Sequence, residues 1–395
     1  MKYGGAVVGG GLLAGCTGDG AGDAPEGNTS TEDETTDGET EDAEDQSYSV
    51  TMEPMGEVTF ESVPERAVVY DPQWADHLVA LGQQDAIASL GFSDGYYTGY
   101  VEALPGVSVD VDDLPGLWDS GLDKEQFYEL DGDVHHVDPC RFTSFDSGLD
   151  REDFEELEEN VGPFFANRFS RAHGEPPEWC RDSYEFYSLW ELLDAFAEVY
   201  QVESRSEALT EVRDEMLDSI YAELPPEEER PVVGLVVYNP DEESFSPYRL
   251  NGPGFGKAHT RPLRARDAFA DSDKTYAENY EGAYDMEGML EVDPDVLLHN
   301  FDWTNGTEEM RERTEAFFAL DEHPVGRELT AVQNDRIYAT GSALQGPIMN
   351  LFQVELSARQ IYPELFGQAP EPGDVAGLGE LFDAQRVADI VNGDI

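Results

Sequence analysis

The chain has 395 residues, and 86 Asp and Glu against 23 Lys and Arg give a formal net charge of -63. This length favours two domains or lobes over one small module, and so acidic a surface repels the phosphates of nucleic acids and anionic lipids. Disorder throughout is also excluded, because 39% hydrophobic and 11% aromatic residues supply enough apolar area for folded cores.

The cationic residues are skewed toward arginine, with only four Lys against nineteen Arg. Extreme acidity with so little Lys resembles the proteins of salt-in halophiles. In molar salt the Debye length falls to about 3 Å, so repulsion between the acidic groups is largely screened. The alternative is an ordinary acidic protein.

The N-terminus is expected to be a signal peptide, residues 1–16. Lys2 precedes an apolar, Gly-rich run, and Leu13-Ala14-Gly15-Cys16 resembles a lipobox in which Cys16 is acylated. The run is too short to span a bilayer, and the alternative is a buried Gly-rich strand. The export route, twin-Arg or general secretory, and the number of lipid chains stay open.

An acidic tether is predicted next, at residues 17–49. Residues 17–46 contain no Val, Ile, Leu, Met or aromatic residue and consist largely of Gly, Thr, Ser, Asp and Glu. Such a composition cannot bury a core and stays solvated.

Strand and helix patterns then alternate in a first lobe, residues 50–181. The predicted elements are a strand at 67–70, a helix at 71–82, a strand at 86–90, a helix at 122–130 and a strand at 132–137. Strands that alternate with helices indicate parallel pairing in an α/β lobe.

Cys140 and Cys180 remain as an even pair once Cys16 is assigned to the lipid anchor. In an exported protein such a pair favours a disulfide. A metal site is the poorer alternative, because no His lies near these two thiols to complete it.

The segment 182–225 is rich in helix formers and is expected to connect the two lobes. A break at Val202-Glu203-Ser204 separates one helix from a second at about 206–223, which Pro225-Pro226 ends. A helix of about 18 residues spans roughly 27 Å and can bridge two lobes as a stiff strut. The alternative is a hairpin of core helices.

The second lobe, residues 226–395, repeats the pattern of the first. Residues 232–238 form an almost wholly apolar run, typical of a strand buried on both faces. A short helix at 284–290 then precedes a strand at 293–298. Glu287 lies eight residues before Asp295, as Glu125 lies eight before Asp133, so the two lobes carry copies of one helix-to-strand unit.

These features together resemble the class III solute-binding proteins of ABC importers, of the ferric-siderophore and vitamin B12 type and here of haloarchaeal character. The resemblance rests on the lipobox, Pro64-Glu65-Arg66 before a helix ending in Ala-Leu-Gly, the two repeated units, the central helix and the closing run 334–339. It covers roughly residues 57–393. The fold that it implies is α/β, with two Rossmann-like lobes that have central parallel sheets and are joined by a long rigid helix.

The resemblance also implies a function and its partners. The protein would be a monomeric, extracytoplasmic lipoprotein, anchored to the membrane through Cys16, that delivers an iron chelate to an ABC permease dimer and its ATPase. Glu125 and Glu287 would dock on the two permease subunits, unless they are ordinary helix-capping residues. Cobalamin, haem and a free metal or oxyanion are alternative ligands, and a surface sensory or adhesive module is the alternative role.

Ligand-binding residues are expected where loops leave the carboxyl ends of the parallel strands. Aromatic rings can stack on a flat chelate, and guanidinium groups pair with its anionic oxygens. About half of the aromatic candidates are expected to be core residues instead. The candidates are Tyr70, Trp74, Tyr96, Tyr97, Tyr100, Trp118, Arg168, Tyr238, Tyr248, Arg249, His259, Arg261 and Trp303.

No catalytic residue, resident metal or cofactor is predicted. His135 and His136 lie in a strand, so their rings point to opposite faces and cannot hold one ion. The chain has no Gly-x-Ser-x-Gly, phosphate loop or His-Glu-x-x-His motif. The Gly-rich segment 251–256 is interpreted as a loop at the ligand cleft.

Overall fold

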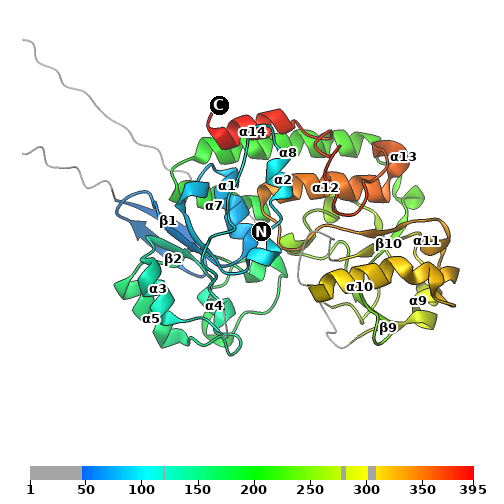
Figure 1. Ribbon diagram of the computed structural model, residues 1–395, viewed down its shortest axis with the longest axis horizontal. Coiled ribbons are helices and arrows are strands. Elements are labelled where there is room, and N and C mark those ends of the chain that lie inside the picture. The colour runs from blue at the N-terminus through cyan, green and yellow to red at the C-terminus, as the bar shows by residue number, and fades with distance from the viewer. Residues whose placement is uncertain (1–46, 119–120, 277–281, 301–307) are drawn as a thin grey trace, which may run out of the picture. The chain divides into compact units, whose positions relative to one another are not determined.

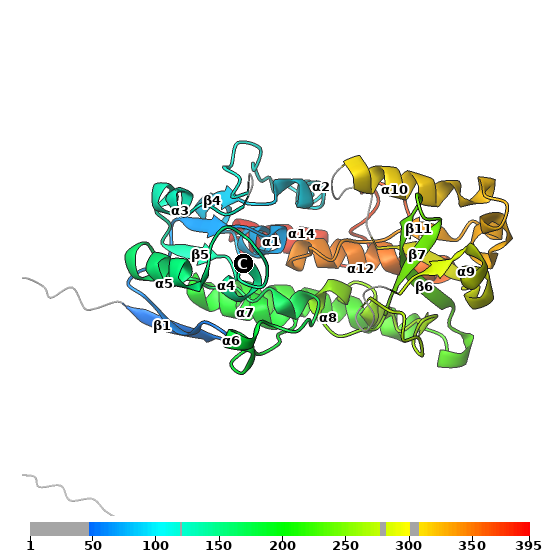
Figure 2. The same cartoon turned by 90° about the horizontal axis from the view of Figure 1, so that it is seen from below.

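A computed structural model describes residues 47–395 apart from 119–120, 277–281 and 301–307. Cys16 and nearly all of the predicted tether lie outside the described residues. Residues 45–395 form one compact unit, and Figures 1 and 2 show its helices and strands. Within the described part, no helix is both long enough and apolar enough to cross a membrane.

The folded part begins with an antiparallel hairpin of β1 (Tyr48–Met52) and β2 (Gly56–Phe60). Alternate residues of both strands are buried, which is the period-two pattern of a half-buried strand. Gly56 has a φ of 74°, a conformation that glycine adopts at little cost. The first strand thus starts inside the segment predicted as tether, and sequence analysis predicted no hairpin here.

The first sheet is parallel and has the order β4–β3–β5, formed by Ile87–Leu90, Ala67–Val69 and Val134–His136. Every residue of β3 and β5 is buried, as expected for strands covered on both faces. The helices of this half are α1 (Pro72–Ala80), α2 (Gly99–Glu102), α3 (Lys124–Leu130), α4 (Pro139–Phe142), α5 (Arg151–Asn160) and α6 (Glu178–Arg181).

The second sheet is mixed. Its order is β11–β10–β6–β7–β9, with β8 paired to β6 as well. The strands β11, β10, β6 and β8 pair in parallel, whereas β7 and β9 add antiparallel pairs. The strands are β6 (Val232–Asn239), β7 (Ser244–Tyr248), β8 (Arg266–Asp267), β9 (Tyr284–Asp285), β10 (Val296–His299) and β11 (Ile337–Ala339).

Helices α9 (Met286–Val292), α10 (Glu308–Phe318) and α11 (Thr330–Gln333) belong to this second half. The two sheets and their helices confirm the predicted α/β fold class.

The connecting segment consists of α7 (Leu189–Val199) and α8 (Glu203–Glu223). Gln201 has a left-handed φ of 53°, and the Val202 N–H donates to Ala197 O at 2.9 Å, which closes the end of α7. The break therefore falls just before the predicted position. The 21 residues of α8 span about 32 Å, and Figure 1 shows α8 extending behind α14 toward the second half.

Two later helices pack against helices of the first half and of the connecting segment, an arrangement that sequence analysis did not predict. Helix α12 (Pro347–Ile361) packs on α1 and α2, and α14 (Ala384–Asn392) packs on α8. Every residue of α12 is buried. One hydrophobic core consequently runs through both halves, from Trp74 of α1 to Leu235 of β6. The short helix α13 (Pro363–Phe366) follows α12.

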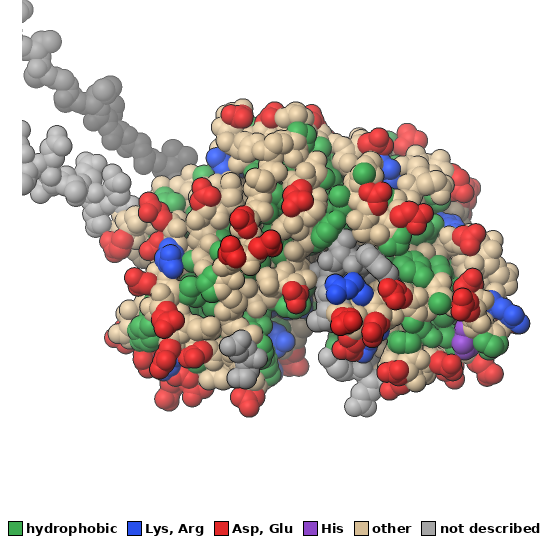
Figure 3. Space-filling view, in the orientation of Figure 1, with side chains coloured by type: hydrophobic (Ala, Val, Ile, Leu, Met, Phe, Trp, Pro, Cys, Tyr) green, Lys and Arg blue, Asp and Glu red, His purple; other side chains and the backbone are tan. Residues whose placement is uncertain are grey.

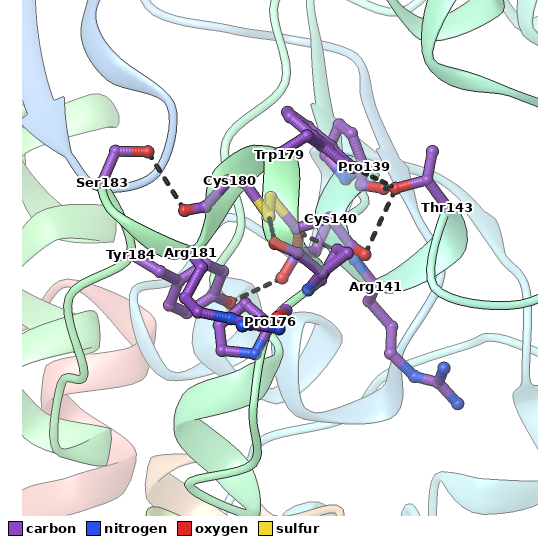
Figure 4. Close-up of a disulfide and its surroundings, with 12 residues drawn as sticks. Pro139, Cys140, Arg141, Thr143, Pro176, Trp179, Cys180, Arg181, Ser183 and Tyr184 are labelled. Atoms are coloured by element: carbon purple, nitrogen blue, oxygen red, sulfur yellow. Dashed lines mark hydrogen bonds between the residues drawn. A yellow bond between two sulfur atoms is a disulfide. The ribbon is translucent and has the colours of Figure 1, made fainter.

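Cys140 of α4 and Cys180 of α6 form a disulfide, with their Cα atoms 6.4 Å apart. Figure 4 shows this link and the nearby bond from Trp179 Nε1 to Thr143 Oγ1, which is 3.0 Å long. The disulfide closes the loop that contains residues 141–179.

Replacing both cysteines with serine should lower the free energy of unfolding by about 2–4 kcal/mol, because the unfolded chain regains the freedom of a loop of 40 residues. Denaturant unfolding of the two proteins measures the difference. Addition of a reductant should lower the midpoint of the unsubstituted protein and leave that of the double variant unchanged. Equal midpoints without reductant would show that the disulfide contributes nothing to stability.

Candidate ligand-binding site

Several loops of the first half meet at the carboxyl edge of its sheet. Asp71 follows β3, and Arg141 lies in α4, just after β5. His135 of β5 also forms a parallel bridge with Phe164, so the chain that continues to Arg168 leaves from the same edge. The open ends of parallel strands are the usual place for a ligand in α/β folds.

Arg168 is held at this edge by two acidic residues. Its Nε donates to Asp71 Oδ1 at 2.8 Å, and its backbone N–H donates to Asp138 Oδ2 at 2.8 Å. Tyr184 O–H donates to the same Asp138 oxygen at 2.7 Å. The side chains of Arg168 and Asp71 are only 13% and 5% exposed, so this pair is a buried ion pair with a fixed geometry.

Two further arginines, Arg141 and Arg171, lie close to Arg168. Burial lowers the pKa of Arg141, and the positive charge of Arg168 lowers it further. Burial, Arg168 and Arg141 lower the pKa of Arg171 well below its usual range, while Asp71 opposes this effect. Within the described residues, the Arg171 guanidinium has no hydrogen bond or ion pair with another side chain. The positive charges of these three arginines thus lie close together, and the neighbouring carboxylates balance them only in part.

The second half contributes one more cation, Lys257. Its Nζ donates to Asn300 Oδ1 at 2.6 Å and lies 4.7 Å from the ring centroid of Tyr248. Burial lowers the pKa of Lys257 to about 7, and the charge of Arg171 lowers it in the same direction. We call Arg141, Arg168, Arg171 and Lys257 the cation cluster.

Glycines allow the two halves to approach at the cation cluster. A Cβ on Gly254 would lie 2.6 Å from Arg171 O, and one on Gly256 would lie 2.9 Å from the same oxygen. Any larger residue would therefore push the loop away from Arg171. Arg261 Nη1 stabilises the Gly-rich loop by donating to Gly252 O and Gly254 O, both at 2.8 Å.

Aromatic rings lie beside the cation cluster in the first half. Tyr70 contacts Phe142 and Trp118, with ring centroids 4.6 and 6.3 Å apart. Trp118 in turn lies 6.0 Å from Phe145, and the Arg141 guanidinium carbon lies 4.4 Å from the Phe145 centroid. Trp118 and Phe145 are 37% and 39% exposed, which leaves ring surface open to a ligand.

Figure 3 shows a notch at the lower edge of the molecule, between the half with α3 to α5 and the half with α9 and α10. Acidic side chains are spread over the displayed face and cationic ones are few. Against this background, a group of four neighbouring cations is an exception.

Three predicted ligand-binding residues, Tyr70, Arg168 and Tyr248, belong to or border the cation cluster. Burial raises the pKa of Tyr70 to about 12, with Asp71 as the next cause, so its hydroxyl stays protonated and can donate to an anion. Trp118 adjoins Tyr70 as described above. These four residues remain candidates for ligand contact.

Four predicted aromatic residues instead belong to the core, as sequence analysis expected for about half of the set. Trp74 is fully buried and stacks on Phe196, at 5.4 Å between centroids. Tyr100 stacks on Phe352 of α12 at 5.4 Å. Tyr96 and Tyr238 are 6% and 5% exposed, so they have almost no surface left for a ligand.

The remaining candidates lie elsewhere or support the loops. Tyr97 O–H donates to Gly373 O at 3.3 Å, in the connection between α13 and α14. His259 is buried, and Gln345 Nε2 lies 2.8 Å from its Nδ1. Arg249 is partly buried, and Trp303 lies outside the described residues.

Sequence analysis missed Arg141, Arg171, Lys257, Asn300 and Phe145. A usable signal was present for two of them. Lys257 is one of only four lysines and directly follows the Gly-rich segment. Arg171 lies three residues after Arg168, which is a predicted ligand-binding residue. Nothing in the sequence indicates that these two residues meet, because 86 positions separate them.

The two repeated units have the same local structure. Helix α3 begins at N-cap Asp123 and ends at Asp131, with φ 47°, and α9 begins at N-cap Asp285 and ends at Asp293, with φ 41°. Glu125 and Glu287 are exposed in the first turns of these helices. Figure 1 shows α3 and α9 at opposite ends of the molecule.

The aspartate that follows each helix accepts a hydrogen bond from the backbone at or just before a strand of the sheet in its half. Asp133 Oδ2 accepts from the backbone N–H of Arg66 at 2.9 Å, before β3, and Asp295 Oδ2 accepts from that of Val232 at 2.7 Å, at the start of β6. The eight-residue spacing from Glu125 to Asp133, and from Glu287 to Asp295, therefore has the same structural basis in each half. It spans the rest of the helix, the left-handed residue that ends it, and the aspartate that bonds to the backbone at the strand.

Among the described residues, no group of three or more His, Cys, Asp or Glu side chains could hold a metal ion. The cation cluster suits an anion, since guanidinium groups offer paired N–H donors to carboxylate, catecholate or phosphate oxygens.

Comparison with solved structures identifies the fold. A periplasmic binding protein from Veillonella parvula aligns with a TM-score of 0.58 at 15% identity, over 82% of this chain and 94% of the other. The iron uptake ABC transporter substrate-binding protein PiuA of Streptococcus pneumoniae has a TM-score of 0.54 at 15% identity, over 79% and 98% of the chains. An ABC-type Fe3+-hydroxamate transport system protein of Saccharomonospora viridis has a TM-score of 0.50 at 17% identity, over 80% and 99%.

No curated protein matches the sequence. The model of the periplasmic binding protein family, however, matches residues 144–344, which are 201 of the 395 residues. This segment contains Arg168, Arg171 and Lys257 of the cation cluster as well as α8 and the strands β6 to β10. With half of its length matched, the chain belongs to the periplasmic binding protein family, whose members bind solutes and are not enzymes.

Proposed function

We propose that this protein is the extracytoplasmic substrate-binding component of an ABC importer, and that it captures an anionic iron chelate at the cation cluster. Proteins with similar folds are described as an iron uptake substrate-binding protein and as part of an Fe3+-hydroxamate transport system. These descriptions support a chelate as the ligand class.

The observation that carries the proposal is the gathering of four cations in a chain with 86 acidic residues and only 23 Lys and Arg. Arg171 and Lys257 come from different halves, and the charge of Arg171 lowers the pKa of Lys257. An anion between them would relieve this repulsion in addition to forming its own contacts. Its binding should therefore stabilise the approach of the two halves.

The neighbouring rings narrow the class of anion. Tyr70, Trp118 and Phe145 offer aromatic faces, and Arg141 already lies over one of them. A ferric complex with aromatic, anionic donor groups could stack on these rings while its oxygens pair with the guanidinium groups. A tris-catecholate complex of iron has these properties, so it is the probe that we choose.

Arg171→Ala should weaken binding of a ferric tris-catecholate at least tenfold, or about 1.4 kcal/mol, because it removes a guanidinium that has no side-chain partner among the described residues. Quenching of Trp fluorescence during titration in molar salt measures the affinity. Arg171→Lys should recover part of the loss, since it keeps the charge but not the paired donors.

Arg151→Ala is the control, because Arg151 is exposed on α5, where it pairs with Glu155 at 2.7 Å and lies over the ring of Trp179, and it is not a member of the cation cluster. It should leave the affinity unchanged. If Arg171→Ala and Arg151→Ala bind the complex equally well, or if an uncharged ferric tris-hydroxamate binds as tightly as the catecholate, the cation cluster is not the determinant of binding.

We further propose that Glu125 and Glu287 dock on an ABC permease. Both carboxylates are exposed at the first turn of a short helix with the same caps, where they can pair with arginines of another protein.

Glu125→Gln or Glu287→Gln should reduce uptake of the labelled chelate by cells severalfold and leave the affinity of the isolated protein unchanged. Glu129→Gln, on the same helix α3, is the control and should have no effect on uptake. Equal uptake by all variants would reject the docking role of these two carboxylates.

We also propose that Cys16 carries a lipid anchor, on the basis of the sequence Leu13-Ala14-Gly15-Cys16. Cys16→Ser should release the protein from the cells into the medium, as measured by immunoblotting of the two fractions. The Cys140 and Cys180 double serine variant controls for the replacement of cysteine elsewhere in the chain. Retention of the Cys16 variant in the membrane fraction would reject this anchor.

A further inference from the structure

The three arginines of the cation cluster all lie within the loop of residues 141–179 that the disulfide closes. They come from two separate stretches of chain, because Arg141 belongs to α4, whereas Arg168 and Arg171 follow α5. Guanidinium groups that bind one anion with paired donors need fixed relative positions. The two stretches must therefore be held together near the site.

One buried carboxylate, Asp138, bonds to both stretches. Its Oδ1 accepts from the backbone N–H of Arg141 at 3.3 Å, and its Oδ2 accepts from that of Arg168 at 2.8 Å. The backbone N–H of Arg171 donates in turn to Arg168 O at 3.3 Å. Asp138 is fully buried. The backbones of all three arginines are thus fixed, directly or through Arg168, by one side chain.

Tyr184 bonds both to Asp138 and to the chain between two of the arginines. Its O–H donates to Asp138 Oδ2 at 2.7 Å, and its oxygen accepts from the backbone N–H of Phe169 at 2.9 Å. The rings of Tyr184 and Phe169 also contact each other, with centroids 5.5 Å apart. Burial raises the pKa of Tyr184, and the charge of Asp138 is the next cause, so the hydroxyl stays protonated and keeps its donor role.

The disulfide holds Tyr184 close to α4. Cys140 and Cys180 are buried and pack with Tyr184 in one small cluster, and Figure 4 shows these three residues together. The backbone N–H of Tyr184 donates to Arg181 O at 3.3 Å, directly after Cys180. The covalent link therefore joins the segment that carries Tyr184 to the helix that carries Arg141.

As a negative charge, Asp138 acts against the binding of an anion. It lies within electrostatic reach of Arg141, and Asp71 already pairs with Arg168. Burial raises the pKa of Asp138, while hydrogen bonds from Tyr184 and from the backbone of Arg168 and α4 oppose this rise. A further carboxylate beside the arginines reduces their attraction for an anion. The charge of Asp138 and its hydrogen bonds should thus change anion affinity in opposite directions.

We propose that Asp138 and Tyr184 are positioning residues of the anion site, which hold the backbones of the three arginines so that their guanidinium groups converge on one ligand. This inference rests on the proposed function of the cation cluster. Neither side chain needs to touch the ligand, because both act through the arginine backbone. The disulfide contributes by keeping Tyr184 within reach of Asp138.

Asp138→Asn separates the effect of position from that of charge. By charge alone, this change should tighten binding of the ferric tris-catecholate, because it removes a carboxylate from beside the arginines. By position it should weaken binding severalfold, because an amide offers one acceptor oxygen in place of the two that the Arg141 and Arg168 backbones use. We expect weaker binding in the Trp fluorescence titration of the full chain in molar salt. Equal or tighter binding would overturn the proposal.

Tyr184→Phe is a second test, which keeps the carboxylate and its charge. It should weaken binding of the ferric tris-catecholate severalfold, because Asp138 and the Phe169 N–H each lose a partner. The matched control is Tyr362→Phe: Tyr362 is 4% exposed against 7% for Tyr184, and its O–H donates to Leu263 O at 3.0 Å in the second half. The control should lose a buried hydrogen bond without a change in affinity. An equal loss of affinity in both variants would contradict the positioning role.

A double-mutant cycle shows whether Tyr184 acts through the arginines. In the Arg171→Ala background, Tyr184→Phe should weaken binding by a smaller factor than in the unsubstituted protein, because one of the positioned guanidinium groups is gone. Equal factors in the two backgrounds would reject this coupling.

The same titrations distinguish this inference from the proposed function. If Arg171→Ala weakens binding as expected but Tyr184→Phe and Asp138→Asn do not, the positioning role fails and the chelate site stands. If Arg171→Ala itself has no effect, the cation cluster does not bind the chelate, and both proposals fail.

Discussion

The contact between α1 and the start of α12 is the constraint on which the arrangement of the two halves depends. Asp76 of α1 is fully buried, and its Oδ2 accepts from the backbone N–H of Met349 at 3.1 Å. Burial raises the pKa of Asp76 to about 7, while hydrogen bonds from Met349, Ile348 and Tyr96 act against this rise. A carboxylate at a helix N-terminus is favoured by the helix dipole. A Cβ on Gly346 would lie 2.6 Å from Asp76 Oδ2, so only glycine permits this approach.

This contact fixes the distance across which the cation cluster forms. Helix α1 begins directly after Asp71, the partner of Arg168, and α12 follows β11 of the second sheet. With both helices packed together, the backbone of Arg171 meets Gly254 and Gly256, and Lys257 comes within the electrostatic reach of Arg171. The fold thus holds like charges near one another, a cost that Asp71 and Asp138 offset only in part and that an anionic ligand would reduce.

Local sequence signals predicted the elements but not their partners. The strands at β3, β5, β6 and β10 and the repeated units lie close to their predicted positions, because hydrophobic runs and Asp caps act within a few residues. Burial depends on distant segments: Trp74 is core because Phe196 stacks on it, whereas Trp118 keeps an exposed face. The packing of α12 and α14 on α1 and α8, and the meeting of Arg171 with Lys257, likewise join positions far apart in the chain and leave no local pattern.

The surface charge and the cation cluster act over different distances, so a protein with this net charge could still bind the proposed anionic chelate. In dilute buffer of about 0.1 M salt the Debye length is about 10 Å, so the net charge of -63 repels an approaching anion well before contact. In molar salt this length falls to about 3 Å, and the repulsion beyond the first contact is largely screened. Arg168, at 13% exposure, is far less open to that screening. Paired N–H donors act at contact distance and keep their geometric preference, so salt removes the long-range barrier while the short-range recognition remains.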